Sequence, residues 1–304
     1  MEATEFIWRD GAFIPWAQAT THVMSHVLHY GSSVFEGIRA YETPMGTRYF
    51  RLACHLRRLM DSARIYQMPV KWSEAELSRA CKDLLLKNRM KHAYVRPLVY
   101  RGYGEMGLDP TRCPVETIIA SWYWGKYLGT AKEGADVCVV SWRRLAPNTM
   151  PSLAKAGGNY LSSQLIRLEA KRHGYAEGIA LTADGFVGEG SGENLFLARD
   201  GVLYTPDAAS SILLGITRET VITLARSMGL EVREARIPRE MLHCADEVFM
   251  CGTAAEITPV RSIDRIPVGR VQPGPITAAV QERFFGLFAG TTKDEWGWLE
   301  PLEG

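Results

Sequence analysis

A single lysine lies among small residues in the stretch Ser152-Leu153-Ala154-Lys155-Ala156-Gly157-Gly158-Asn159-Tyr160, directly before a segment predicted to be helical. Lysine is normally a solvated surface residue, and that is the simplest interpretation of this stretch alone. The alanines and glycines around Lys155 would nevertheless let a ligand approach the backbone closely. A lysine held in this way can lose its proton and form a Schiff base with a carbonyl compound. The glycine spacing does not match a phosphate-binding P-loop.

The composition is that of an ordinary soluble globular protein with room for two domains. The 304 residues are 46% hydrophobic and 23% charged, and the net charge is +1. This balance gives no reason to expect nucleic acid or an acidic membrane as a partner. The six cysteines form no C-x-x-C pair and no metal-ligand spacing, which favours buried thiols, a reducing compartment and no bound metal. We expect no membrane span and no secretory signal, and therefore a cytoplasmic protein.

Local patterns in the first part of the chain predict strands followed by helices. An Asp-Gly turn between apolar flanks is a hairpin signal, leucines recur at helical spacing, and a Ser-x-x-Glu capping box opens a second helix. The predicted elements are a hairpin over 8–14, helices over 52–66 and 73–88, and strands over 93–100 and 117–120.

The second part mixes strands, hairpins and helices, which indicates an α+β or α/β architecture in two domains. We place the domains at 1–120 and 131–304, with an aromatic, glycine-rich connection at 121–130. Asn159 is the expected cap of one helix, which Gly174 closes, and Thr217 or a neighbour is the expected cap of another. The predicted elements are a strand over 136–141, a helix over 159–172, Asp-Gly hairpins at 184–185 and 200–201, a helix from 215 and a strand over 247–250.

Lys155 becomes a candidate catalyst only if other groups can hold a carbonyl cofactor. Glu189 lies among small residues, and a carboxylate held there could keep a pyridine nitrogen protonated, which makes the ring a better electron sink. For Glu193, four residues on, a solvated position in a hairpin loop is the better interpretation. Two predicted helix-opening segments, at 215–217 and 252–254, offer backbone N–H groups and hydroxyls that suit a phosphate. Threonine is also a common cap with no ligand.

Four motifs together resemble the bacterial branched-chain amino-acid aminotransferases, which belong to the class IV pyridoxal-phosphate aminotransferases of fold type IV. The resemblance runs from about residue 7 to residue 298 without a large insertion. It implies a fold like that of D-amino-acid aminotransferase, with a small α/β domain and a larger pseudo-barrel domain. The motifs are MSHVLHYGSSVFEGIR at 24–39, KAGGNY at 155–160, EGSGENLF at 189–196 and GTAAEITPV at 252–260.

The resemblance implies that the chain binds pyridoxal 5′-phosphate through residues of several segments. Lys155 would form the Schiff base with it, and Glu189 would pair with its pyridine nitrogen. Arg58 would bind the phosphate, although its place off the apolar helical stripe would otherwise indicate a solvated arginine. The remaining implied cofactor contacts are Tyr160 at the phenolic oxygen, Leu213 against the ring face, and Ile216, Thr217 and Thr253 at the phosphate.

The implied reaction is a reversible, ping-pong transamination. Lys155 would act as the general base that carries the α-proton. The amino group of L-leucine, L-isoleucine or L-valine would pass to a 2-oxo acid, which in the family is 2-oxoglutarate.

Substrate recognition is implied at a second set of residues. Arg96 would bind the distal carboxylate of glutamate through its planar guanidinium, and Tyr94 would help to fix the α-carboxylate. Without the resemblance, these two residues would be interpreted as an alternating strand with one outward charge. The other implied substrate contacts are Tyr30, Phe35, Gly37, Leu108, Tyr127, Tyr160, Thr253 and Ala254.

The resemblance also implies a homo-oligomer. In the family, Tyr30 and the loop 104–108 come from the partner subunit, so a dimer is the minimum and a hexamer of three dimers is consistent with the family.

Other activities share the lysine and glutamate motifs. They are D-amino-acid aminotransferase, (R)-selective amine aminotransferase and aminodeoxychorismate lyase, and a non-catalytic pyridoxal-phosphate-binding protein is a further alternative. Tyr94, Arg96 and the segment 35–39 favour the branched-chain enzyme.

Overall fold

The computed structural model describes residues 2–125 and 134–303, and these fold into two compact units. Of the described residues, one unit comprises 2–125, 154–158 and 288–303, and the other comprises 134–153 and 159–287. The predicted limits of 1–120 and 131–304 placed residues 154–158 and 288–304 in the second domain, because local patterns do not show where a chain returns to an earlier part of the fold. Residues 126–130 of the predicted connection lie outside the described residues.

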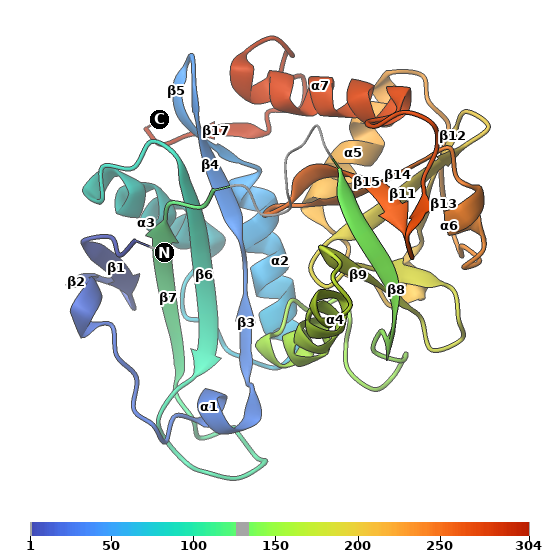
Figure 1. The fold of residues 1–304 in the computed structure, drawn as a ribbon. Helices are drawn as coiled ribbons and strands as arrows, with labels where there is room; N and C mark the ends of the chain where they lie inside the picture. The colour runs from blue at the N-terminus through green and yellow to red at the C-terminus, as the bar shows by residue number, and fades with distance from the viewer. Residues whose placement is uncertain (1, 126–133, 304) are drawn as a thin grey trace. The chain divides into compact units, whose positions relative to one another are not determined.

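The first unit is an antiparallel sheet covered by two helices (Figure 1). The strand order is β17-β5-β4-β6-β7-β1-β2, with β3 beside β6. Helix α3 packs on β7 and β1, helix α2 packs on β3, and both contribute leucines to one core. The strands are β1 (Phe6–Arg9), β2 (Ala12–Pro15), β3 (Ser33–Phe35), β4 (Ile38–Thr43), β5 (Gly46–Phe50), β6 (Ala93–Arg101), β7 (Val115–Trp122) and β17 (Leu299–Pro301); the helices are α1 (His26–Tyr30), α2 (Leu52–Ile65), α3 (Glu74–Lys87) and the short 3₁₀ turn Trp16–Gln18.

The predicted elements of this unit are confirmed. The Asp-Gly hairpin pairs Ile7 with Ile14, and both predicted helices form. The capping box is complete, since Ser73 Oγ accepts the N–H of Glu76 while the Glu76 carboxylate accepts the N–H of Ser73.

The second unit is built on a mixed sheet (Figure 1). The order is β10-β9-β8-β15-β14-β11-β12-β13, with β16 beside β15; the pairs β8–β9, β8–β15 and β12–β13 are parallel. The strands are β8 (Ala135–Arg143), β9 (Glu177–Leu181), β10 (Val187–Glu189), β11 (Asn194–Arg199), β12 (Val202–Pro206), β13 (Val232–Ala235), β14 (Glu247–Gly252), β15 (Glu256–Ile263) and β16 (Ile266–Pro267); the helices are α4 (Tyr160–Arg172), α5 (Ile216–Ser227), α6 (Met241–Cys244), α7 (Pro275–Ala289) and 3₁₀ turns at Gly157–Asn159 and Ala208–Ser210.

One local prediction in this unit is wrong. The segment 252–254 opens no helix, because Gly252 ends β14, and Thr253 and Ala254 lie in the turn of the β14–β15 hairpin. Asn159 stands at the N-cap position of α4, as predicted, but its side chain makes no capping hydrogen bond and its amide donates to the carbonyl of Pro151. Gly215 is the N-cap of α5, within the segment predicted to open that helix. Helix α7, in contrast, was not predicted at all.

Candidate functional site

Lys155 lies in the short segment that returns to the first unit. Its carbonyl accepts the N–H of Phe35 at 3.0 Å, and its own N–H donates to Ser62 Oγ at 3.0 Å. The side chain is half-buried, with Nζ 5.0 Å from the centre of the Phe35 ring. The backbone of Lys155 is therefore fixed between β3 and α2, and its side chain, although it stands in a loop before a helix, is only partly exposed.

The glycine two residues after Lys155 is needed for this placement. A Cβ atom at Gly157 would lie 2.3 Å from Ser33 Oγ, far inside contact distance. The small residues after Lys155 thus let the segment pack closely on the start of β3.

Arg58 is held in place by a buried acid. Its Nε and Nη2 donate to the two carboxylate oxygens of Glu36 at 2.6 and 2.9 Å. His55 Nδ1 donates to the same carboxylate at 2.7 Å, and since a carboxylate only accepts, this nitrogen carries the ring proton. The guanidinium of Arg58, predicted at the phosphate, is thereby held by Glu36, which lies between β3 and β4.

The charges of this cluster are set by burial and by one another. Burial alone would raise the pKa of the Glu36 carboxyl, but Arg58 and His55 hold this pKa far below its usual value. Burial lowers the pKa of His55, and Glu36 offsets only part of that effect. The cluster therefore consists of one carboxylate, one guanidinium and a neutral imidazole at neutral pH.

Arg96 lies among aromatic rings on β6. Its guanidinium carbon is 4.6 Å from the ring centre of Phe35 and 5.6 Å from those of Tyr94 and Trp122. The hydroxyl of Tyr94 passes directly over Gly37, where a Cβ atom would be 1.8 Å away. Arg96 is half-buried, so the interpretation as an outward charge is wrong.

Two other predicted substrate residues are exposed on this unit. Tyr30 is 44% and Leu108 is 89% exposed. His26 links their segments, with Nδ1 2.7 Å from Ser32 Oγ and Nε2 2.9 Å from the carbonyl of Gly107. Tyr127 lies outside the described residues.

Glu189 is the centre of a buried polar cluster in the second unit. Its carboxylate pairs with Arg144 Nη2 at 2.6 Å and accepts Asn194 Nδ2 and the N–H of Leu213, each at 3.1 Å. Leu213 also accepts Asn194 Nδ2 at 2.8 Å through its carbonyl. The structure thus brings Leu213 and Glu189 together, and the loop before α5 is tied to the end of β10.

Arg144 was not predicted from the sequence. It follows β8 in an Arg-Arg pair whose spacing carries no signal, whereas Asn194 belongs to the motif at 189–196. In the part of the chain that the structure describes, Arg144 Nε and Nη1 are buried without a hydrogen-bond partner, so the guanidinium is engaged through Nη2.

The other predicted cofactor residues of this unit lie at the N-terminal ends of two helices and in one hairpin turn. Ile216 and Thr217 are buried in the first turn of α5, whose N-cap residue, Gly215, makes no side-chain capping hydrogen bond. Thr253 and Ala254 lie in the β14–β15 turn, and Tyr160 begins α4.

The predicted solvation of Glu193 is wrong, because this residue is only 3% exposed.

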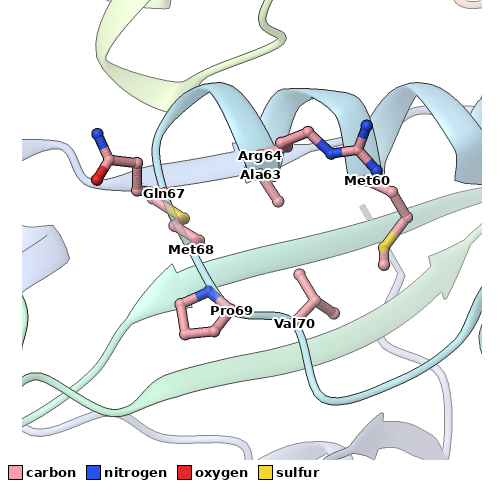
Figure 2. A pocket seen from close by; sticks show the side chains of 7 residues that line it. All are labelled: Met60, Ala63, Arg64, Gln67, Met68, Pro69 and Val70. Carbon is pink, nitrogen blue, oxygen red and sulfur yellow. The ribbon is translucent and has the colours of Figure 1, made fainter.

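A surface hollow beside the C-terminal end of α2 involves none of the predicted site residues. Figure 2 shows side chains from α2 and from the segment that follows it around this hollow. The lining residues are Met60, Ala63, Arg64, Gln67, Met68, Pro69 and Val70.

Comparison with known proteins identifies the family. The model of amino-transferase class IV matches residues 33–263. The branched-chain-amino-acid aminotransferase of Salmonella typhimurium is 54% identical over 98% of this chain and 97% of its own. The chain belongs to the class IV aminotransferases. Within them, it belongs with the branched-chain group.

Two solved structures have the same fold as this class IV aminotransferase. The branched-chain amino acid aminotransferase of Escherichia coli superposes with a TM-score of 0.97 at 54% identity, covering 98% of this chain and 99% of its own. The T.th. branched-chain amino acid aminotransferase, complexed with N-(5′-phosphopyridoxyl)-L-glutamate, gives 0.95 at 42% identity, with 99% and 100% coverage. The two-domain, fold-type IV architecture expected from the sequence is confirmed.

Class IV aminotransferases use pyridoxal 5′-phosphate, and the chemistry of the residues fits this cofactor. Glu189 is a buried carboxylate held by a cation and two N–H donors, which suits a protonated ring nitrogen. In the first unit the cationic guanidinium of Arg58 suits a phosphate, and in the second unit the N-terminal turn of α5 is a feature of the same kind. Among the described residues, no cluster of side chains could hold a metal ion. No helix among them is long and apolar enough to cross a membrane.

Proposed function

We propose that this protein is a branched-chain-amino-acid transaminase, which reversibly transfers the amino group between L-leucine, L-isoleucine or L-valine and 2-oxoglutarate. The observation that carries the proposal is the 54% identity to such an enzyme over 98% of this chain and 97% of the relative. Coverage this complete leaves no domain of that relative unmatched.

The proposed roles follow the two clusters. Pyridoxal 5′-phosphate, when bound, withdraws electrons from the α-carbon of an amino acid. Lys155 Nζ would bind the cofactor and would then take and return the α-proton. Glu189, fixed by Arg144, would keep the ring nitrogen protonated. Arg58, with Ile216, Thr217 and Thr253, would bind the phosphate, while Tyr160 and Leu213 would orient the ring.

The proposed substrate site must accept an aliphatic side chain and a carboxylate in turn. Arg96 can serve both, because its guanidinium is stacked among rings and remains able to meet a distal carboxylate. The T.th. enzyme was solved with a glutamate adduct, which supports glutamate as one substrate. Tyr94 and the turn with Thr253 and Ala254 would fix the α-carboxylate. Phe35, Gly37, Tyr30, Leu108 and Tyr127 would shape the side-chain pocket.

We further propose a homo-oligomer in the cytoplasm. The exposure of Tyr30 and Leu108 supports a partner subunit over these residues, with a dimer as the minimum and a hexamer as an option. All six cysteines are unpaired thiols, which supports a reducing compartment.

Four substrates test the proposal. We expect L-leucine to bleach the visible absorbance of the bound cofactor, while D-alanine, (R)-1-phenylethylamine and aminodeoxychorismate leave it unchanged. Pyruvate release from aminodeoxychorismate would instead identify a lyase, and bleaching by D-alanine alone a D-amino-acid aminotransferase.

The catalytic role of Lys155 has its own test. Lys155→Ala is expected to abolish turnover, because no proton carrier remains, while the far-ultraviolet circular dichroism stays that of the wild type. Transamination at the normal rate by Lys155→Ala would overturn the assignment.

A further inference from the structure

Three glutamates are buried around the loop that carries Glu189. Glu177, Glu193 and Glu189 are 0%, 3% and 5% exposed. Two arginines accompany them: Arg144 pairs with Glu189 at 2.6 Å, and Arg167 pairs with Glu177. Each of these arginines is thus engaged by a glutamate other than Glu193.

Glu193 is the carboxyl group that lacks a cation. Among the residues that the structure describes, its carboxyl accepts one hydrogen bond, from the N–H of Gly192 at 3.0 Å, and forms no ion pair. A buried carboxylate without a paired charge is very unfavourable, and such a group takes up a proton instead.

The net effect of the surrounding groups also favours the protonated form of Glu193. Burial, together with the charges of Glu177 and Glu189, raises the pKa of Glu193 to about 8, although Gly192 N–H and Arg167 offset part of this effect. On the neighbouring strand β14, Cys251 is also buried, and Glu193 contributes to the raised pKa of its thiol. Arg218 of α5 acts on Cys251 but pairs with Glu234 at 2.9 Å.

The position of Glu193 connects it to Glu189. The carbonyl of Glu193 accepts the N–H of Gly190 at 2.7 Å, and its Oε2 would lie 2.6 Å from a Cβ atom placed on Gly190. The carboxyl group thus packs against the residue directly after Glu189. An ionised group there would add a second negative charge and raise the proton affinity of Glu189.

We propose that Glu193 is a neutral carboxylic acid in the working protein. It is a positioning residue that supports the loop between Glu189 and Glu193, and its neutrality leaves Glu189 as the only anion of that loop. The significance of this arrangement for the cofactor rests on the proposed function, since Glu189 is assigned there to the ring nitrogen. The protonation of Glu193 itself rests on the cluster alone.

Infrared difference spectra of the holoenzyme test the protonation directly. We expect the wild type minus Glu193→Gln to show the carbonyl stretch of a protonated carboxyl at pH 6.5, lost as the pH rises through about 8. Glu177→Gln removes a neighbouring negative charge and releases Arg167 to pair with Glu193. The band should therefore disappear at lower pH in that variant. Absence of the band from the wild type at pH 6.5 would overturn the proposal.

Stability provides a second readout if the spectra are crowded. The pKa of Glu193 is higher in the folded than in the unfolded protein. Its contribution to the free energy of unfolding is therefore fully present below the unfolded-state pKa, and it is lost as the pH rises through the folded-state pKa. Glu193→Gln keeps the neutral shape and should lose less stability than the wild type between pH 6.5 and 9. An equal loss in both proteins would contradict the proposal. Failure to transaminate L-leucine with the band intact would overturn the proposed function alone.

Discussion

Arg144 forms a buried ion pair with Glu189 at 2.6 Å, and removing it should have a large effect. Arg144→Leu deprives a buried carboxylate of this cation, which typically costs about 3 to 5 kcal/mol of unfolding free energy. We expect this loss in urea denaturation of the holoenzyme, together with weaker cofactor retention, because Glu189 then takes up a proton. Arg144→Lys should recover part of both.

The neighbouring arginine supplies the matched control. Arg143 is exposed and Arg144 is buried, so Arg143→Leu removes the same charge and adds the same side chain without touching Glu189. Equal stability and equal cofactor retention in the two leucine variants would show that the Arg144–Glu189 pair has no role.

Single residues could be proposed for the site where a motif surrounds them. Lys155 and Glu189 stand among small residues that local sequence reveals, and Arg58 was proposed only through the family resemblance. Arg144 and the burial of Glu193 could not be predicted, because both depend on which strands become neighbours. Burial of a polar side chain is a property of tertiary packing, and local sequence predicts it poorly.

At the scale of elements, the capping box of α3 makes a quantitative prediction. Ser73→Ala removes the acceptor of the Glu76 N–H and the partner of the Glu76 carboxylate. We expect a loss of about 1 kcal/mol in unfolding free energy, the usual cost of a lost N-cap. Glu74→Gln, one residue into the same exposed turn, is the control, and a Ser73 variant no less stable than this control would contradict the role of the cap.

Elements with a strong local signal were predicted, and the others were not. Helix α3 has a cap and an apolar stripe, whereas α7 is apolar on most sides and shows no stripe. The segment 252–254 was mistaken for a helix opening because Gly-Thr-Ala also suits a tight turn. Pairing of β14 with β15, which local sequence does not show, decides between the two.

At the scale of the whole molecule, the proposed dimer can be tested by mixing two inactive variants. Leu108→Asp should lose most activity, because this 89% exposed side chain is proposed to complete the substrate pocket of the partner subunit. Lys155→Ala is inactive for a different reason. In a mixed dimer, one site would combine the intact lysine of one subunit with the intact loop of the other. Refolding the two variants together at equal amounts should therefore restore about a quarter of the wild-type sites, since half of the dimers are mixed and each has one intact site.

The control separates loop complementation from a general effect of a surface charge. Met45→Asp changes a side chain that is 62% exposed in the β4–β5 turn and is not assigned to any site. This variant alone should remain active, and mixing it with Lys155→Ala should only average the two activities. If Leu108→Asp and Lys155→Ala stay inactive after mixing, although native mass spectrometry shows mixed dimers, each subunit must build its site from its own loop. Recovered activity would establish that the loop at Leu108 acts across the subunit interface, which explains why a side chain of this size is exposed in a single chain.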